Sequence, residues 1–153
     1  MAAKPKPDAR QCFNLANSFH EGSIRCGENV LDPVTGTHHS PQTPELVNAA
    51  FAGELYMKAL ALRRVPEVNG HNLQWLYENA LDDAERSAIS GHYQVLLGSS
   101  DEWLTRNLEQ FARAFTEWRY VYEVDERFIN SAALMAFVKA AYLTVRDVAP
   151  ERP

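Results

Sequence analysis

The sequence predicts an all-α protein, an antiparallel bundle of about five to six helices. Apolar residues recur at intervals of three and four residues through most of the chain, as they do on one face of a helix. No segment keeps the two-residue alternation, bounded by turns, that is typical of strands. Turn-forming residues are dense only between Gly22 and Thr43, which we interpret as a long surface loop.

At 153 residues the chain is long enough for one domain with its own core, and we expect a single domain over residues 1–153. The loop is predicted over residues 22–43, and both termini are predicted to be short and disordered. No repeat is visible in the sequence. The organisation of the chain is therefore expected to be one bundle with one large loop.

The first two helices flank that loop. The first is predicted from about Asp8 to His20. The second has Thr43 as its expected cap and Pro44 at its first position, and it continues as ELVNAAFAGELYMKALALRR to the residues before Pro66. It is apolar almost all round, which predicts a helix that runs through the middle of the bundle.

Two further helices follow the turn VPEVNG. A short one covers NLQWLYENA, and we expect His71 or the asparagine after it to cap the helix start. The next is opened by Asp82 or Asp83 and ends near Gly98.

A fifth helix is predicted to begin at Ser100 or Asp101 and to carry one apolar seam. The seam residues are spaced by four, three, four, three and four positions, as in a helix packed against neighbours. They are Leu104, Leu108, Phe111, Phe115, Trp118 and Tyr122. Because Phe115 occupies the middle of this seam, we expect it to be buried in the core. A last helix is predicted from about Arg127 to Val148.

Charge and composition restrict the partners. The 20 acidic and 15 basic residues give a formal net charge of −5, so the chain as a whole should repel nucleic acid, and a phosphate would need a local basic site. Two cysteines do not form a disulfide framework, which favours a reducing cytoplasm. The sequence shows no signal peptide and no apolar run long enough to span a bilayer, so no membrane partner is expected.

Glu54 and Lys58 are the only charged residues between Leu46 and Leu62 of the second helix. One interpretation is an ion pair at four-residue spacing, on the strip of the helix that reaches water. The other places Glu54 in a polar site shared with Arg119. The neighbouring Gly53 would allow another helix to approach closely.

Arg119 stands between Trp118 and Tyr120 in the stretch FARAFTEWRYVYE. It can pair with Glu123 one turn later, which at the surface would contribute well under about 1 kcal/mol. Among large aromatic residues it could instead be partly buried, where a guanidinium requires an anionic partner such as Glu123 or a ligand phosphate.

We expect no metal site and no cofactor. His38 and His39 are adjacent in the loop, but no third ligand stands at a recognisable spacing. The sequence also lacks a phosphate-binding glycine loop, a serine elbow and a cysteine–histidine pattern.

Three segments in order, AAFAGELYMKALAL, GHNLQWLYENA and AFTEWRYVYE, resemble the HEPN superfamily of small helical bundles. The resemblance covers roughly Leu46 to Leu143. It implies a homodimer, and many of the proteins it resembles are metal-independent ribonucleases whose motif is an arginine, four to six residues, then a histidine. Arginine would hold the scissile phosphate, and histidine would exchange a proton near neutral pH.

Only the arginine of that motif has a counterpart, Arg119. The permitted window for the histidine holds Val124, Asp125 and Glu126, and no histidine follows His92. Asp125 is a weak substitute, because an ordinary carboxyl group titrates about three pH units below neutrality.

The sequence therefore predicts a HEPN-like module that is non-catalytic or degenerate. It would bind a nucleotide or RNA phosphate, or a cognate protein partner, in a stress, defence, toxin–antitoxin or regulatory setting. The expected ligand-binding residues are Arg119, Tyr120, Glu54 and Lys58. The first alternative is a ribonuclease with an unusual site, with Arg119, Tyr122, Glu123 and Asp125 as candidate catalytic residues and Glu54 as a further member. The second alternative is a helical interaction module with no ligand.

Overall fold

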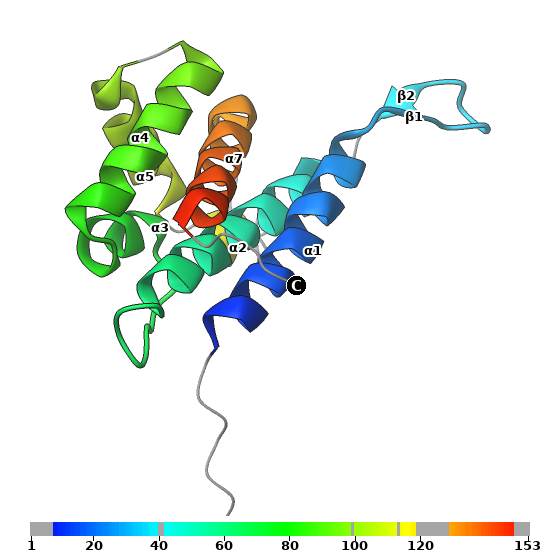
Figure 1. Cartoon of the computed structure of the whole chain (residues 1–153). Coiled ribbons are helices and arrows are strands. Elements are labelled where there is room, and N and C mark those ends of the chain that lie inside the picture. Colours follow the sequence, from blue (N-terminus) through cyan, green and yellow to red (C-terminus); the bar gives the residue numbers. More distant parts are fainter. Residues whose placement is uncertain (1–7, 40–41, 99, 113, 119–128, 149–153) are drawn as a thin grey trace, which may run out of the picture.

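A computed structural model of the chain describes residues 8–39, 42–98, 100–112, 114–118 and 129–148. It is an all-α bundle, as the sequence predicts (Figure 1). The helices are α1 (Ala9–Gly27), α2 (Gln42–Ala61), α3 (Leu73–Trp75), a π-helical turn η1 (Leu76–Ala80), α4 (Asp83–Leu97), α5 (Asp101–Phe111), α6 (Ala114–Trp118) and α7 (Ser131–Val148). A two-stranded hairpin, β1 (Val30–Leu31) and β2 (His38–His39), joins α1 to α2.

The expected loop over residues 22–43 is mostly regular structure, so that prediction is wrong. Helix α1 continues past His20 to Gly27, and the hairpin projects from the end of the α1–α2 pair (Figure 1). The Asp32 carboxylate accepts the Val34 amide at 2.8 Å, and Gly36 adopts a positive φ of 68° that closes the turn. Pro33 and Gly36 therefore lie in a tight hairpin turn within a connection shorter than expected.

Helix α2 is the central element of the bundle, as its apolar character predicts. Twelve of its 20 residues are buried, which requires neighbours on almost every side. Helix α1 packs along it, and α7 and α6 cover other faces. A Cβ atom on Gly53 would lie 3.4 Å from Val138, so this glycine faces α7 at close range, as expected.

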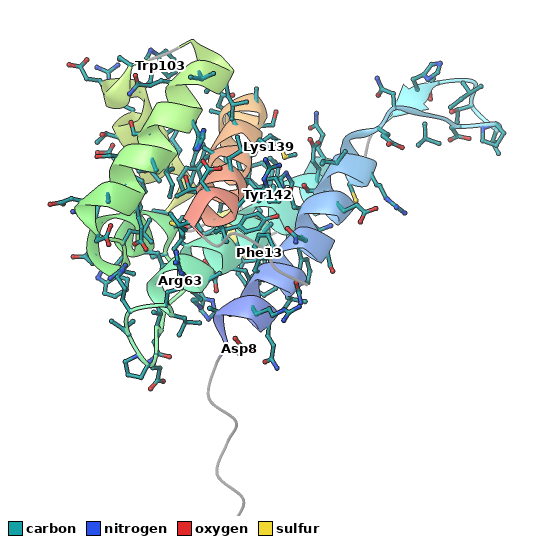
Figure 2. The ribbon with its side chains drawn as sticks, viewed as in Figure 1. Asp8, Phe13, Arg63, Trp103, Lys139 and Tyr142 are labelled. Atoms are coloured by element: carbon teal, nitrogen blue, oxygen red, sulfur yellow. The ribbon has the colours of Figure 1, made fainter. Side chains whose placement is uncertain are left out.

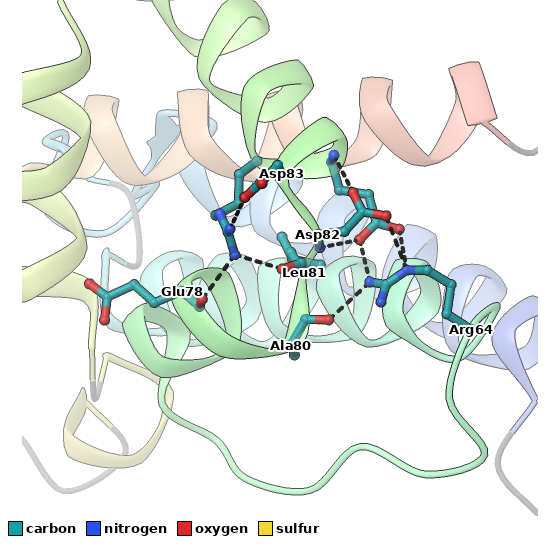
Figure 3. A network of polar contacts seen from close by, with 8 residues as sticks. Arg64, Glu78, Ala80, Leu81, Asp82 and Asp83 are labelled. Atoms are coloured by element: carbon teal, nitrogen blue, oxygen red, sulfur yellow. Dashed lines mark hydrogen bonds and ion pairs between the residues drawn. The ribbon is translucent and has the colours of Figure 1, made fainter.

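The turn from η1 into α4 is held by an ion-pair network (Figure 3). Asp82 caps α4 in a reciprocal capping box with Glu85. Arg64, which follows α2, binds both carboxylate oxygens of Glu85, at 3.3 and 2.5 Å, and donates to the Ala80 carbonyl at 3.0 Å. Both oxygens of Glu85 are thus satisfied although the residue is buried.

The predicted fifth helix is broken into α5 and α6. Leu104, Leu108 and Phe111 are buried as expected, but α5 ends at Phe111. The Ala112 carbonyl, which a continued helix would use four residues later, instead accepts the Leu73 amide at 3.0 Å. This tertiary hydrogen bond fixes the start of α3 at the break.

Because of this break, Phe115 is half-buried at the edge of the core and not inside it, which corrects the sequence expectation. Its ring stacks on Phe51 of α2, with centroids 4.4 Å apart. Trp118 is also half-buried, and Tyr122 lies outside the described residues. The final helix begins at Ser131, where the Asn130 side chain accepts the Ala133 amide at 3.0 Å, and not near Arg127.

A second polar cluster lies between α1, α2 and α7, where Phe13 and Tyr142 face each other (Figure 2). The Tyr56 hydroxyl donates to Asn17 at 2.8 Å and meets Nδ1 of His20 at 3.1 Å. Burial lowers the pKa of His20, so the neutral ring is favoured and donates through Nδ1. The Tyr56 hydroxyl thus has partners in both Asn17 and His20, so we assign a structural role to this cluster.

Comparing Phe111 with Phe115 tests the broken helix. Phe111→Ala should lower the free energy of unfolding by about 3–5 kcal/mol, since it removes a fully buried ring and leaves a cavity. Phe115→Ala should cost roughly half as much, because its ring is already partly exposed. Guanidinium titrations of both variants measure the difference, and an equal or larger loss for Phe115→Ala would contradict the break.

Candidate functional site

The candidate site is a buried carboxylate in the middle of α2. Glu54 is only 1% exposed, and its Oε1 atom receives two donors. Lys58 Nζ lies at 2.7 Å, one turn along the helix, and His71 Nδ1 lies at 2.9 Å, in the connection before α3. The three side chains form one cluster in which a lysine balances the charge of the carboxylate and an imidazole shares the same oxygen.

The ion pair between Glu54 and Lys58 is present, but it does not lie on a water-facing strip as one interpretation expected. Lys58 is only 14% exposed, and α2 is covered on this side by other elements. Desolvating two charges is costly, and substituting apolar residues for such a pair is often neutral or stabilising. Stability of the fold alone therefore does not explain why charged residues stand at these positions.

The second oxygen of Glu54 is the most unusual atom of the cluster. Oε2 is buried and has no hydrogen-bond partner among the described residues. Leaving a buried acceptor unpaired costs about 1–3 kcal/mol, and more when the group is charged. Such an atom indicates a place where a further donor belongs.

Of the two residues expected to cap the helix, Asn72 does so and His71 does not. The cap is Asn72, whose side chain accepts the Trp75 amide at 2.9 Å. The His71 ring is 58% exposed and lies 6.0 Å from the Phe115 ring, centroid to centroid. The cluster thus joins α2, the connection before α3, and α6.

Sequence reasoning missed the contact between His71 and Glu54. The two residues are 17 positions apart and belong to different elements, so no helical spacing links them. The only signal was the lone pair of charges in an otherwise apolar helix, which pointed to Glu54 but not to its partner.

Several predicted site residues cannot be placed beside this cluster. Arg119, Tyr120, Tyr122, Glu123 and Asp125 lie outside the described residues. The last described residue before them is Trp118 of α6, a helix that packs on α2.

Cys12 of α1 lies near the cluster but is not an activated nucleophile. Burial raises the pKa of its thiol, and the nearby positive charge of Lys58 opposes this only in part. The neutral thiol is a weak nucleophile, so we assign no chemistry to it.

A surface groove of about 430 Å³ lies elsewhere, between η1, α4 and α5. Its charged residue, Arg86, donates to the carbonyls of Glu78 and Leu81 and pairs with Asp83 (Figure 3). The arginine is already satisfied, so the groove offers an anion little.

No group of three or more potential metal ligands occurs within the described ranges. None of the helices in that part of the chain is long and apolar enough to cross a membrane.

Comparisons with protein-family models, with curated proteins and with solved structures found no match to this chain. The resemblance to the HEPN superfamily therefore stays a prediction from the sequence.

A double-mutant cycle tests whether the Glu54–Lys58 pair is buried. Glu54→Leu alone should lower the free energy of unfolding by about 3–5 kcal/mol, because it leaves the Lys58 charge buried without a partner. Adding Lys58→Met should restore most of that loss. The measurement is guanidinium unfolding of both single variants and the double variant.

The exposed pair of Glu21 and Arg25 in α1 is the control, since it has the same spacing and its side chains are 63% and 73% exposed. Its coupling energy should be below about 1 kcal/mol. Similar coupling energies for the two pairs would show that Glu54 and Lys58 are solvated.

Proposed function

We propose that this chain is a HEPN-like helical module that binds a phosphate group of RNA or a nucleotide at a site built on Glu54, Lys58 and Arg119. The observation that carries the proposal is the buried Glu54 oxygen that lacks a donor among the described residues. A guanidinium is suited to that role, because its planar fork can donate to a carboxylate from one edge and to a phosphate from another.

Chain connectivity supports Arg119 as this donor. It directly follows Trp118, so their Cα atoms are about 3.8 Å apart. Trp118 ends α6, the helix whose Phe115 ring stacks on Phe51, three residues before Glu54 in α2. Arg119 is therefore the next residue of the sequence after α6, the helix that packs on α2.

The charges of the cluster also suit an anion. Glu54 and Lys58 cancel each other, so Arg119 would add one net positive charge to the site. A local positive charge is needed, because the whole chain carries a formal charge of −5. In this arrangement the carboxylate orients the arginine, and the arginine and Tyr120 contact the ligand.

The remaining parts of the proposal come from the family resemblance. They are a homodimer, a stress, defence or regulatory setting, and a cognate protein as a further partner, whereas the cytoplasmic location is proposed from the cysteine content. A ribonuclease built from Arg119, Tyr122, Glu123 and Asp125 is the first alternative from the sequence, and a module that binds only protein is the second.

Arg119→Ala tests phosphate binding. The variant should bind a labelled single-stranded RNA of mixed sequence at least about tenfold more weakly, a loss of roughly 1.4 kcal/mol. Its binding should also depend less on salt, with a log–log slope reduced by about one phosphate contact. Fluorescence anisotropy at several salt concentrations gives both quantities.

Arg106→Ala is the matched control, because Arg106 is an exposed arginine of α5. It should change neither quantity. If Arg119→Ala leaves RNA affinity unchanged but lowers the free energy of unfolding by about 1–3 kcal/mol, Arg119 is a structural clamp and the proposal fails.

Light scattering tests the dimer. At tens of micromolar protein we expect twice the mass of a single chain, because the resemblance implies a twofold pair. A mass of 17.3 kDa would contradict this part of the proposal and leave phosphate binding untouched.

A further inference from the structure

We infer that Lys139 and Arg146, on either side of Tyr142 in α7, form a second anion site for a small ligand with two neighbouring oxyanion groups. The site uses none of the residues of the proposed function. It lies where α7 meets α1, and Figure 2 shows Lys139 and Tyr142 beside Phe13 of α1. Both cationic side chains are exposed, so a ligand can reach them.

The two cations converge on one aromatic ring. Lys139 precedes Tyr142 by three residues and Arg146 follows it by four, so the three lie on one side of the helix. Lys139 Nζ is 4.7 Å from the centre of the Tyr142 ring, and the guanidinium carbon of Arg146 is 5.9 Å from it. The ring is itself held by Phe13, which stacks nearly parallel to it at 6.2 Å between centroids. Two positive charges are therefore positioned around one fixed group.

The acidic residues of the two helices are engaged with other cations. The only acidic residue of α7 is Asp147, which bonds His92 of α4 at 2.9 Å. The only one of α1 is Glu21, which pairs with Arg25. Among the described residues, the two cations beside Tyr142 form no ion pair. This part of the surface is thus positive, although the chain as a whole carries a formal charge of −5.

The buried His20 ring of α1 senses the same positive charge. It lies 6.0 Å from the Tyr142 ring, centroid to centroid. Burial lowers the pKa of His20, and the charge of Lys139 lowers it further. A nearby carboxylate would raise this pKa, and none among the described residues does so. The field of Lys139 is therefore not cancelled within the described part of the chain.

The stability of α7 explains only one of the two cations. A basic residue in the last turn, such as Arg146, interacts favourably with the helix dipole. Lys139 stands in the middle of α7, where the dipole does not favour it. Each cation is attracted by the face of the Tyr142 ring, but the two repel each other. An oxyanion bound between them would remove that repulsion.

The arrangement favours a compact ligand with two anionic groups. A guanidinium binds the paired oxygens of a phosphate or a carboxylate with its planar fork, whereas an ammonium acts as a point charge. Because Lys139 and Arg146 are seven residues apart, roughly 10 Å along the helix, one oxyanion group for each cation fits better than a single group. A long polyanion would also meet the negative remainder of the surface.

Titration of the full chain with pyrophosphate or malonate, followed by NMR of the assigned imidazoles, tests the site. The pKa of His20 should rise when the bound anion offsets the charge of Lys139. Chloride at the same ionic strength gives the baseline for screening. His38 of the hairpin is the internal control and should respond no more than it does to chloride.

Arg146→Gln is the most informative variant, because the charge of Arg146 does not set the pKa of His20 in the free protein. That pKa should stay at the parent value, while the affinity for the anion falls at least about tenfold. Lys139→Gln should by itself raise the pKa of His20 and remove the response to the anion, and Lys139→Arg should retain the response. Arg106→Gln, at an exposed arginine of α5, is the matched control and should bind like the parent.

Arg119→Ala should leave the response of His20 unchanged, so this site and the proposed function can fail separately. If neither pyrophosphate nor malonate shifts the His20 titration more than chloride does, or if Arg146→Gln binds like the parent, the inference is overturned. Phosphate and acetate, with one group each, should bind at least about tenfold more weakly than pyrophosphate and malonate. Equal affinities within both pairs would overturn the two-group ligand, and the tighter of the two-group anions identifies the site as selective for phosphoryl or carboxylate groups.

Discussion

The whole structure depends on the burial of α2 on nearly all sides. A helix in that position can be almost entirely apolar, and from Leu46 to Ala61 the only charged residues of α2 are Glu54 and Lys58. Because the Glu54 carboxylate is only 1% exposed, the surrounding elements have to supply its partners. The connection before α3 supplies one of them, because it places His71 within hydrogen-bonding distance of Glu54. The position of this connection therefore depends on a polar atom of α2.

The break between α5 and α6 also affects the surroundings of Glu54. A continuous helix of the predicted length would have carried Phe115 in one seam with Phe111. The Ala112 carbonyl bonds to the Leu73 amide, and the short α6 packs on α2 with Phe115 on Phe51. The same bond fixes the start of α3, two residues after His71. One tertiary hydrogen bond thus positions two of the three elements that meet at Glu54.

Local signals were sufficient for much of the fold. The start of α4 at Asp82, its end near Gly98 and the largely apolar character of α2 are each encoded within a few residues, and each was predicted from the sequence. The errors arose where distant residues decide the outcome. The Ala112–Leu73 bond spans 39 positions, and the burial of Glu54 depends on which elements cover α2.

The candidate site was predictable to the same degree. Two charges in an apolar helix marked Glu54 and Lys58, but whether they faced water could not be determined from periodicity, because a helix that is apolar all round has no single wet face. The partner His71 required knowledge of the fold. Arg119 was identified from its neighbours in the sequence and from the family resemblance.

A comparison of the two buried glutamates separates structure from function in this molecule. Glu85 is 6% exposed, and both of its oxygens are matched, one by Arg64 and the other by Arg64 and the Asp82 amide. Glu85 thus shows the hydrogen bonding of a buried carboxylate with a structural role in this fold. Glu54 is more deeply buried, yet two donors share one of its oxygens while the other has no partner among the described residues. Among the described residues, one buried acid is thus fully matched while the other keeps an unmatched oxygen, and this contrast is the strongest reason to place the function at Glu54.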